Sequence, residues 1–395
     1  MTIPQFLIAL FASVAVGVIT SVTIQAGDDG GVVEIWDSLQ PVPVAAAIPQ
    51  LSNVRFQVIK PHEPDTDGGY GFLHGVALAW HHDRLYAAWG HNKGPENTAG
   101  EEARGRVSTD GGFTWSDTFT IDAGNDGMAV SHGVFLSSQE KLWAFMGAFH
   151  GKRRDVHTRA YLLDEESGTW EFQSVVVQGG FWPMEQPIRM NDGNWMMGGF
   201  VVGDGNPAAV AISHGENLLD WDLIVIPRPV DQRMWGESTT IVDGLQILNI
   251  ARSRDSPVAL AAFSRDFGRS WTPSRPGNLP MVKSKPYAGK LSTGQRYLVC
   301  TTTADSGNRR SPLTIAVSAP NKSLFSGVYT IRDATFADGP GDSHPEARLS
   351  YPYAIEYNEF LYVGYSNSGG RQGMNLNSAE LAVIPIAELR SRQNE

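Results

Sequence analysis

Two segments far apart in the chain share the pattern Ser-x-Asp-x-Gly-x-x-Trp. They are Ser108-Thr-Asp110-Gly-Gly112-Phe-Thr-Trp115 and Ser264-Arg-Asp266-Phe-Gly268-Arg-Ser-Trp271. The Ser and Asp side chains can accept hydrogen bonds from nearby backbone amides, Gly permits a positive φ, and the Trp covers the turn. Each segment is therefore predicted to form a tightly held turn between two strands, which points to an all-β chain.

The aromatic residue of this pattern recurs at a nearly constant interval. Trp115, Trp170, Trp221 and Trp271 follow one another at about 50 to 55 residues, and Phe325 comes one such interval later. The segments before Trp170 and Trp221 are looser versions of the same turn. A period of this length is typical of a β-propeller, in which each blade ends in an equivalent turn.

The complete pattern resembles the Asp-box of sialidase-like (BNR) β-propellers. The resemblance implies an all-β fold with a single β-propeller, and it places the boxes at outer turns that lie far from propeller active sites. It therefore says much about fold and little about chemistry. Each unit is expected to hold two apolar strands around a short turn, and the chain contains six such units: 75–89, 133–146, 186–197, 238–250, 289–300 and 353–364.

Ring closure is expected to use both ends of the propeller. The strand Glu380–Ile386 is predicted to pair with an N-terminal strand, either Val32–Ile35 or Val54–Val58, which would protect the edges of the ring. A seventh blade assembled from both termini is also compatible with the pattern.

Composition limits the classes of partner. The formal net charge of −11 argues against a nucleic-acid-binding surface but leaves room for an anionic substrate held by local arginines. Cys300 is the only cysteine, so no intrachain disulfide forms, and its apolar neighbours indicate a buried strand residue. No cofactor is required by any motif, and the metal ligands, if any, are unknown.

The first 26 residues contain no charged side chain apart from the N-terminus and include an apolar stretch from Phe6 to about Val22. They resemble a secretory signal peptide, although no basic residue precedes the apolar stretch, and a membrane anchor is the alternative. The expected organisation is a signal peptide over residues 1–26 and a catalytic β-propeller over residues 27–395. The mature protein is expected to be secreted, free of the membrane and monomeric.

Propeller active sites lie at the face where the innermost strands begin, here called the mouth. The predicted register places four histidines there: His74, His91, His132 and His150. His81 and His82 occupy a turn at the opposite end of the first unit, where they are expected to be solvated. A single His at a strand end is more often a turn or packing residue, so the repeat carries the functional interpretation.

The later residues at the mouth include Glu237, Arg252, Arg310 and Tyr353 in that order. This order resembles the second half of the sialidase site, where a Glu, two carboxylate-binding arginines and a nucleophilic Tyr follow one another. The planar guanidinium suits a carboxylate because it donates two parallel hydrogen bonds. The first half departs from that family: there is no Phe-Arg-Ile-Pro segment, and histidines stand where an acidic acid/base is expected.

Histidines at these positions resemble the sites of polysaccharide lyases with the same fold, the ulvan lyases and the L-rhamnosyl-glucuronate lyases. Such an enzyme removes the C5 proton of a uronate after its carboxylate is neutralised. The resemblance implies that His74 and His91 act as the acid/base and neutralising pair, with His132 or Tyr353 as partner. It also allows a bound divalent cation such as Ca²⁺, although no dense run of Asp demands one. The residues assigned to substrate binding are Arg252, Arg310, Glu237, His150, Trp182 and Lys285.

Three functions follow from these observations. The leading one is a secreted lyase that cleaves an acidic polysaccharide at a glucuronate, with rhamnose as the expected neighbour. The second is a sialidase-type exo-glycoside hydrolase, in which Tyr353 pairs with Glu237. The third is a carbohydrate-binding propeller without catalysis, in which the convergence of histidines is incidental.

Overall fold

The computed structural model describes residues 31–64, 69–125 and 127–389. The chain divides into a unit of residues 1–31 and a unit of residues 32–395, and the propeller lies in the second. The predicted signal peptide falls outside the described residues. Within the described residues, no helix is long and apolar enough to cross a membrane.

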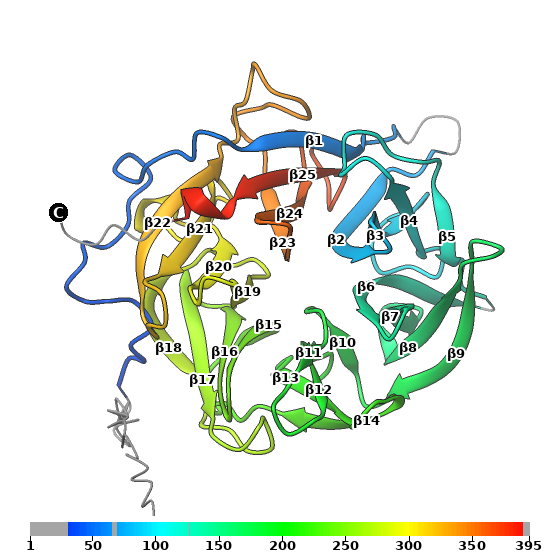
Figure 1. Cartoon of the computed structure of the whole chain (residues 1–395), viewed down its shortest axis with the longest axis horizontal. Coiled ribbons are helices and arrows are strands. Elements are labelled where there is room, and N and C mark those ends of the chain that lie inside the picture. The colour runs from blue at the N-terminus through cyan, green and yellow to red at the C-terminus, as the bar shows by residue number, and fades with distance from the viewer. Residues whose placement is uncertain (1–30, 65–68, 126, 390–395) are drawn as a thin grey trace, which may run out of the picture. The chain divides into compact units, whose positions relative to one another are not determined.

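Six small antiparallel sheets surround a central axis as the blades of a propeller (Figure 1). Five of them follow one another along the chain, and the sixth combines strands from both ends. Blade 1 comprises β2 (Phe72–His81), β3 (Arg84–Asn92), β4 (Glu102–Ser108) and β5 (Phe119–Asp122). Blade 2 comprises β6 (Met128–Ser138), β7 (Lys141–His150), β8 (Arg154–Asp164) and β9 (Thr169–Val177).

The innermost strand of blade 3 is split into two pieces that both pair with β12. Blade 3 comprises β10 (Phe181–Pro183), β11 (Ile188–Arg189), β12 (Trp195–Val201), β13 (Ala208–His214) and β14 (Asn217–Val225). Blade 4 comprises β15 (Met234–Asp243), β16 (Gln246–Ser253), β17 (Val258–Ser264) and β18 (Arg275–Pro280). Blade 5 comprises β19 (Tyr287–Lys290), β20 (Arg296–Cys300), β21 (Leu313–Ser318) and β22 (Phe325–Arg332).

Blade 6 closes the ring. It comprises β23 (Leu349–Tyr357), β24 (Phe360–Asn367), β25 (Ser378–Pro385) and, as its outer strand, β1 (Arg55–Lys60). Figure 1 shows β1 and β25 side by side, and their antiparallel register pairs Phe56 with Ala382. The prediction that a strand near Val54–Val58 closes the ring is confirmed. The alternative segment instead bridges blade 4, where Val33 pairs with Gly277.

Position in the blade explains the sequence of each strand. Inner and second strands are buried on both faces, so β3 and β7 read as nearly continuous runs of apolar and small residues. An outer strand such as β14 is mostly exposed or half-buried, and only Leu218 and Trp221 of its residues are buried. Two short 3₁₀ turns, Ala304–Ser306 and Ile386–Glu388, are the helical segments of the described residues. Cys300 is a free, buried strand residue, as predicted.

Both complete boxes form the predicted turns between the third and fourth strands of blades 1 and 4. Ser108 Oγ accepts the Gly112 amide at 2.8 Å, and Asp110 Oδ1 accepts the Thr114 amide at 2.9 Å. Gly112 has φ +89°, and a Cβ there would lie 2.7 Å from Cδ2 of Leu381 on β25. The first box therefore also packs its blade against the neighbouring blade 6.

This contact predicts that alanine is more harmful at Gly112 than at Gly111. Gly111 also has a positive φ, of +75°, but a Cβ there would meet nothing within 4 Å, so it serves as the matched control. Gly111→Ala should lower the free energy of unfolding by about 1 kcal/mol through backbone strain. Gly112→Ala should cost about 1 to 3 kcal/mol more, because buried Leu381 must also move. Urea unfolding of both variants measures the difference, and equal losses would contradict the inter-blade contact.

Candidate functional site

Four of the inner strands carry a β-bulge close to the mouth. The register shifts between His74 and Ala77 in β2, between Val130 and Gly133 in β6, between Met234 and Ser238 in β15, and between Ser350 and Tyr353 in β23. A bulge inserts extra residues and redirects their side chains. The four bulges contribute four of the polar side chains of the candidate site: His74, His132, Glu237 and Tyr351.

The Glu237 carboxylate joins two of the other functional groups. Its Oε2 accepts a hydrogen bond from Nη1 of Arg252 at 2.7 Å, and its Oε1 accepts the hydroxyl of Tyr351. Tyr351 has φ +54°, a left-handed conformation that is costly for a bulky residue and that persists only where the surroundings impose it. The strained backbone and the hydrogen bond to a carboxylate therefore belong to the same residue, Tyr351.

Burial and charge set the protonation states of this group. Burial raises the pKa of Tyr351, and the Glu237 carboxylate raises it further. Burial alone would lower the pKa of Arg252, but Glu237 more than offsets this, and the net pKa is raised. At neutral pH, Tyr351 is thus a neutral phenol held against a carboxylate, and Arg252 is firmly charged.

Arg310 is a second cation beside Tyr351. Its guanidinium lies 6.0 Å from the centre of the Tyr351 ring and donates from Nη2 to the carbonyl of Lys283 at 3.1 Å. Burial lowers its pKa, and the positive charge of Arg252 lowers it further. Arg310 also lines a cavity of about 490 Å³, together with three further arginines and two acidic residues, namely Arg309, Arg348, Arg371, Asp305 and Glu346.

His74 and His132 complete the group. The His74 ring lies 3.8 Å from the Tyr351 ring and 5.9 Å from the His132 ring, measured between centroids. Burial lowers the pKa of both imidazoles, that of His132 to about 3, so both are neutral at pH 7. Gly75, with φ +72°, allows the close approach, because a Cβ there would lie 2.3 Å from Cγ of His132.

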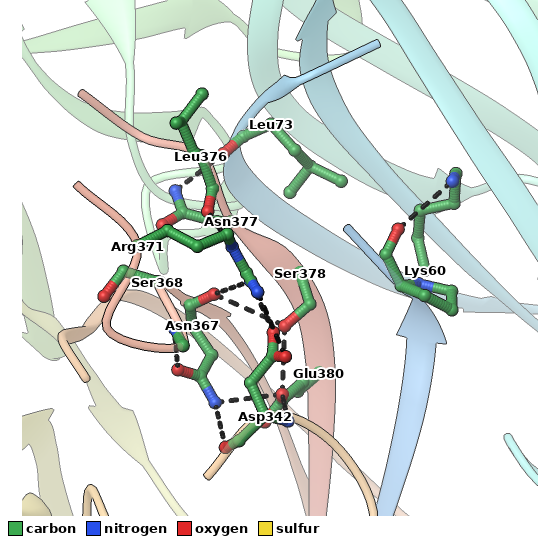
Figure 2. Close-up of polar contacts among 12 residues, drawn as sticks. Lys60, Leu73, Asp342, Asn367, Ser368, Arg371, Leu376, Asn377, Ser378 and Glu380 are labelled. Carbon is green, nitrogen blue, oxygen red and sulfur yellow. Dashed lines mark hydrogen bonds and ion pairs between the residues drawn. The ribbon is translucent and has the colours of Figure 1, made fainter. Parts of the chain in front are cut away.

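Asn377 fixes the orientation of His74. Its amide nitrogen donates to the carbonyl of Leu73 at 2.7 Å (Figure 2). The same nitrogen lies 3.4 Å from Nδ1 of His74. Because this nitrogen is a donor, Nδ1 of His74 accepts and the neutral ring carries its proton on Nε2. The segment that brings Asn377 to blade 1 follows β24.

A buried polar network beneath that segment holds it in place. Figure 2 shows Glu380 at its centre, where Oε1 accepts hydrogen bonds from Asn367, Ser378 and the amide of Asp342, each at 2.9 Å. Arg332 pairs with the other oxygen of Glu380. This network supports the same blade that presents Tyr351.

Lys285 and Tyr353 lie below the candidate site. Lys285 donates from Nζ to the carbonyl of Pro352 at 2.8 Å, and burial lowers its pKa to about 7. Tyr353 is 1% exposed and packs on Tyr287 with ring centroids 4.5 Å apart.

Glu185 lies in the break between β10 and β11. It accepts hydrogen bonds from Thr239 and Thr240, and burial raises the pKa of its carboxyl to about 7.

The structure therefore brings together His74, His132, Glu237, Arg252 and Arg310 as the sequence predicts, but Tyr351 reaches Glu237 in place of Tyr353. A regular strand would point both tyrosines the same way, and the bulge between Ser350 and Tyr353 breaks this alternation.

Three other predicted residues lie elsewhere. His91 pairs with Leu73 while His74 pairs with Gly90, so His91 projects from the opposite face of blade 1, where it stacks on Tyr70 at 4.5 Å. The geometry does not support His91 as the partner of His74. His150 is half-buried at the end of β7, where it pairs with Arg154.

Trp182 supports the site without facing a sugar. It is 4% exposed, and its indole nitrogen donates to the carbonyl of His132 at 2.9 Å. The predicted role of Trp182 in substrate binding is not supported, because neighbouring side chains cover it and its ring lies 5.0 Å from that of His132. Its role in the structure is to hold the bulge of β6.

Sequence reasoning missed Trp235 and Glu96. Trp235 lies in the bulge of β15, is half-buried, and has Arg153 at 5.5 Å and Arg252 at 5.9 Å from its ring. Glu96 follows β3 in a loop at the mouth. Burial raises the pKa of its carboxyl, Arg153 opposes that shift, and Glu237 adds to it. The rule that loops leaving second strands converge on the mouth could have found Glu96, which lies five residues after His91.

One group of described residues has side chains spaced to hold a metal ion: His81, His82 and Glu165, at the other end of β2. His81 is 4% exposed, so the expectation that both histidines are solvated is wrong for this one.

The comparisons with known proteins agree with this architecture. A sequence model described as "BNR repeat-like domain" matches residues 83–363. No curated protein sequence matches the chain significantly. Among solved structures, a protein of unknown function from Dyadobacter fermentans aligns at 12% identity with a TM-score of 0.63, over 85% of this chain and 99% of that one.

Two sialidases are similar in fold. The NanB sialidase from Streptococcus pneumoniae aligns at 10% identity with a TM-score of 0.64, over 84% of this chain and 71% of that one. Trypanosoma rangeli sialidase aligns at 11% identity with a TM-score of 0.62, over 86% of this chain and 60% of that one. This chain thus spans less than two thirds of the trypanosomal protein.

The central role of Glu237 predicts a large stability effect. In Glu237→Gln, buried Arg252 loses its counter-ion, and the free energy of unfolding should fall by about 3 kcal/mol. The matched control is Asp255→Asn, which breaks the exposed pair between Asp255 and Arg233 at 2.7 Å and should cost about 0 to 1 kcal/mol. Urea unfolding measures both, and similar small losses would show that Glu237 is not the electrostatic centre of the site.

Proposed function

The chain belongs to the BNR repeat-like domain family, and from this premise we propose that it is a glycoside hydrolase that releases a carboxylate-bearing sugar from a glycan, with Tyr351 as its nucleophile. One observation carries the proposal: Glu237 accepts the Tyr351 hydroxyl while Arg252 orients the same carboxylate. A nucleophile, a base and a group that orients the base are the parts that covalent catalysis requires. The similarity in fold to two sialidases supports the same reaction class.

The first half of the reaction forms a bond between the enzyme and the sugar. Glu237 takes the proton of Tyr351, the phenolic oxygen bonds to the anomeric carbon, and the glycosidic bond breaks. Glu96 gives its proton to the departing oxygen. A carboxyl with a raised pKa suits this task, because it keeps its proton nearer to neutrality.

The second half restores the enzyme. Water gives a proton to Glu96 and bonds to the anomeric carbon, while the phenolic oxygen leaves and regains its proton from Glu237. Two displacements at one carbon retain its configuration.

The substrate carboxylate is assigned to Arg310. Arg252 is already engaged by Glu237, whereas the hydrogen bond of Arg310 goes to a neutral carbonyl. Burial lowers the pKa of Arg310, and the surrounding protein groups do not fully compensate for the lost hydration of its charge. An anion that binds to this guanidinium therefore gains a strong charge-assisted hydrogen bond. Trp235, half-buried beside Arg252, offers an apolar ring to a sugar face. The proposal includes export of the chain, since glycan polymers are met outside the cell. It also includes a monomeric protein.

A uronate-specific lyase is the second candidate, and His74 favours it. Its neutral ring lies against Tyr351 with the proton on Nε2. In this reaction Tyr351, after Glu237 takes its proton, removes the C5 proton of the uronate. The Tyr351 hydroxyl formed in this way gives that proton to the departing O4 and regains its own proton from Glu237, and a C4–C5 double bond remains. Neutral His74 donates a hydrogen bond from Nε2 to the departing oxygen. Arg310 neutralises the carboxylate, which makes the C5 proton removable.

Isotope-labelled water and ultraviolet absorbance distinguish the two reactions. We expect the purified protein to release acidic sugar from sialylated or uronate-bearing glycans, with ¹⁸O from the solvent at the new anomeric hydroxyl. New ultraviolet absorbance without ¹⁸O would identify the lyase instead. Binding of the glycans without either product would leave a carbohydrate-binding propeller and contradict both candidates.

Tyr351→Phe tests the nucleophile. It should lower kcat/KM by about a thousandfold, because the attacking oxygen is removed. Tyr353→Phe is the matched control, since Tyr353 lies below the site, and it should retain activity within about threefold. Equal effects of the two variants would contradict the assignment.

Glu96→Gln tests the acid. With natural glycans it should lower kcat/KM by about a hundredfold to ten-thousandfold and remove the basic limb of the pH profile. With aryl glycosides, whose leaving groups need no proton, the first step should stay nearly unchanged. Loss of activity on both substrates in equal measure would show that Glu96 is not the acid.

A further inference from the structure

A second cluster of histidine and glutamate side chains, spaced so that they could bind a metal ion, lies at the end of the ring away from the mouth. His81 and His82 form the turn between β2 and β3 of blade 1, Glu165 lies in the turn between β8 and β9 of blade 2, and Glu140 lies in the turn between β6 and β7. His81 is seven residues from His74 along one strand, which corresponds to about 23 Å. The cluster is therefore separate from the Tyr351 site.

Both imidazoles direct one ring nitrogen at the same carboxylate. Nε2 of His81 lies 2.9 Å from Oε1 of Glu165, and Nδ1 of His82 lies 3.0 Å from Oε2. One ligand atom from each of the three residues lies within 4.8 Å of the others, so a single ion can contact all three. Two histidine nitrogens and one carboxylate oxygen form a donor set that Zn²⁺ prefers.

The other nitrogen of each ring also has an oxygen partner. Nδ1 of His81 lies 2.9 Å from Oγ of Ser137, and Nε2 of His82 lies 2.9 Å from Oε2 of Glu140. Histidines that bind metals usually donate their second N–H to an oxygen, which fixes the tautomer and makes the ligand nitrogen more basic. This outer set of contacts is what distinguishes the cluster from an ordinary His–Glu pair.

The turn that carries the histidines is held in a fixed shape. His82 and Asp83 have φ of 45° and 58°, which are left-handed values that cost energy for non-glycine residues. Oδ1 of Asp83 accepts the hydroxyl of Tyr357 from blade 6 at 2.6 Å. A cavity of about 410 Å³ opens beside the turn and is lined by His81, His82 and Asp83, which leaves room for a water or another ligand.

We propose that His81, His82 and Glu165 form a Zn²⁺ site with three protein ligands and an open fourth position that faces this cavity. Ser137 and Glu140 orient the two imidazoles. Because the ligands come from two blades, the ion links the lower turns of blade 1 and blade 2. This site is independent of the glycan reaction proposed at the mouth.

Zinc titration of the full-length protein tests the site. Protein stripped with a chelator and returned to neutral buffer should bind one Zn²⁺ in calorimetry, and its Tm should rise with added Zn²⁺. Co²⁺ in the same site should give the visible absorption of a four-coordinate ion. No binding of either ion would overturn the proposal.

Single substitutions then assign the ligands. His82→Ala and Glu165→Gln should each weaken Zn²⁺ binding at least a hundredfold, and Glu140→Gln should weaken it about ten- to a hundredfold, because it disturbs only the orientation of His82. The matched control is His214→Ala, which removes an exposed histidine that lies 3.4 Å from a single carboxylate, that of Asp222, and should change nothing.

His82, Glu140 and Glu165 lie in turns and are exposed. The melting curve without metal checks that each variant is folded. If His214→Ala abolishes binding, or if His82→Ala and Glu165→Gln bind as the parent does, the ion lies elsewhere and the proposal fails. Either result would leave the cluster as a set of His–Glu ion pairs that join two blades.

Discussion

The antiparallel pairing of β1 with β25 is the constraint on which the ring depends. Without β1, the edge of β25 would expose a row of unpaired backbone groups, and the last blade would lose the strand through which the chain continues into the first blade. Contacts such as that of Leu381 with Gly112 would then have to hold the two blades together. Closure also fixes how far apart the inner strands start, and so it sets the distances between side chains at the mouth. About 320 residues separate the two strands, so this contact is among the slowest for a folding chain to find.

Within that ring, four β-bulges make the inner strands differ from one another and so form the candidate site. A propeller without bulges would repeat the same side-chain directions in every blade. The extra residues in β2, β6, β15 and β23 turn His74, His132, Glu237 and Tyr351 away from the regular pattern and toward one another. The cost is visible as the left-handed backbone of Tyr351. The hydrogen bond from the Tyr351 hydroxyl to the Glu237 carboxylate offsets part of it.

The sequence was sufficient for the architecture because the fold repeats. Two boxes and the spacing of tryptophans indicated the propeller, and the pairs of apolar strands indicated six units, with a seventh blade left open. Closure by both ends followed from the terminal strands. Repetition also located most of the candidate site, because equivalent positions in each blade meet. Inference from the repeat was wrong where the local structure of one blade differs from that of the other blades. The bulge made Tyr351 the partner of Glu237 in place of Tyr353, and strict strand alternation turned His91 away from His74. Glu96 lies in a loop without periodicity, so only its position in space identifies it.

The arginines beside Arg310 matter also for how a substrate arrives. A chain with a formal net charge of −11 repels a polyanion from a distance, and this repulsion slows their encounter. At physiological ionic strength that field fades within about 8 Å, so an approaching glycan meets mainly the local charges of the cavity lined by Arg309, Arg348 and Arg371. Dissolved salt thus has two opposite effects on the rate at which a polyanion meets this protein. It screens the net negative charge of the protein, and at higher concentration it also screens the arginines of the cavity. Under the function proposed above, capture of an acidic glycan should therefore be fastest at an intermediate salt concentration.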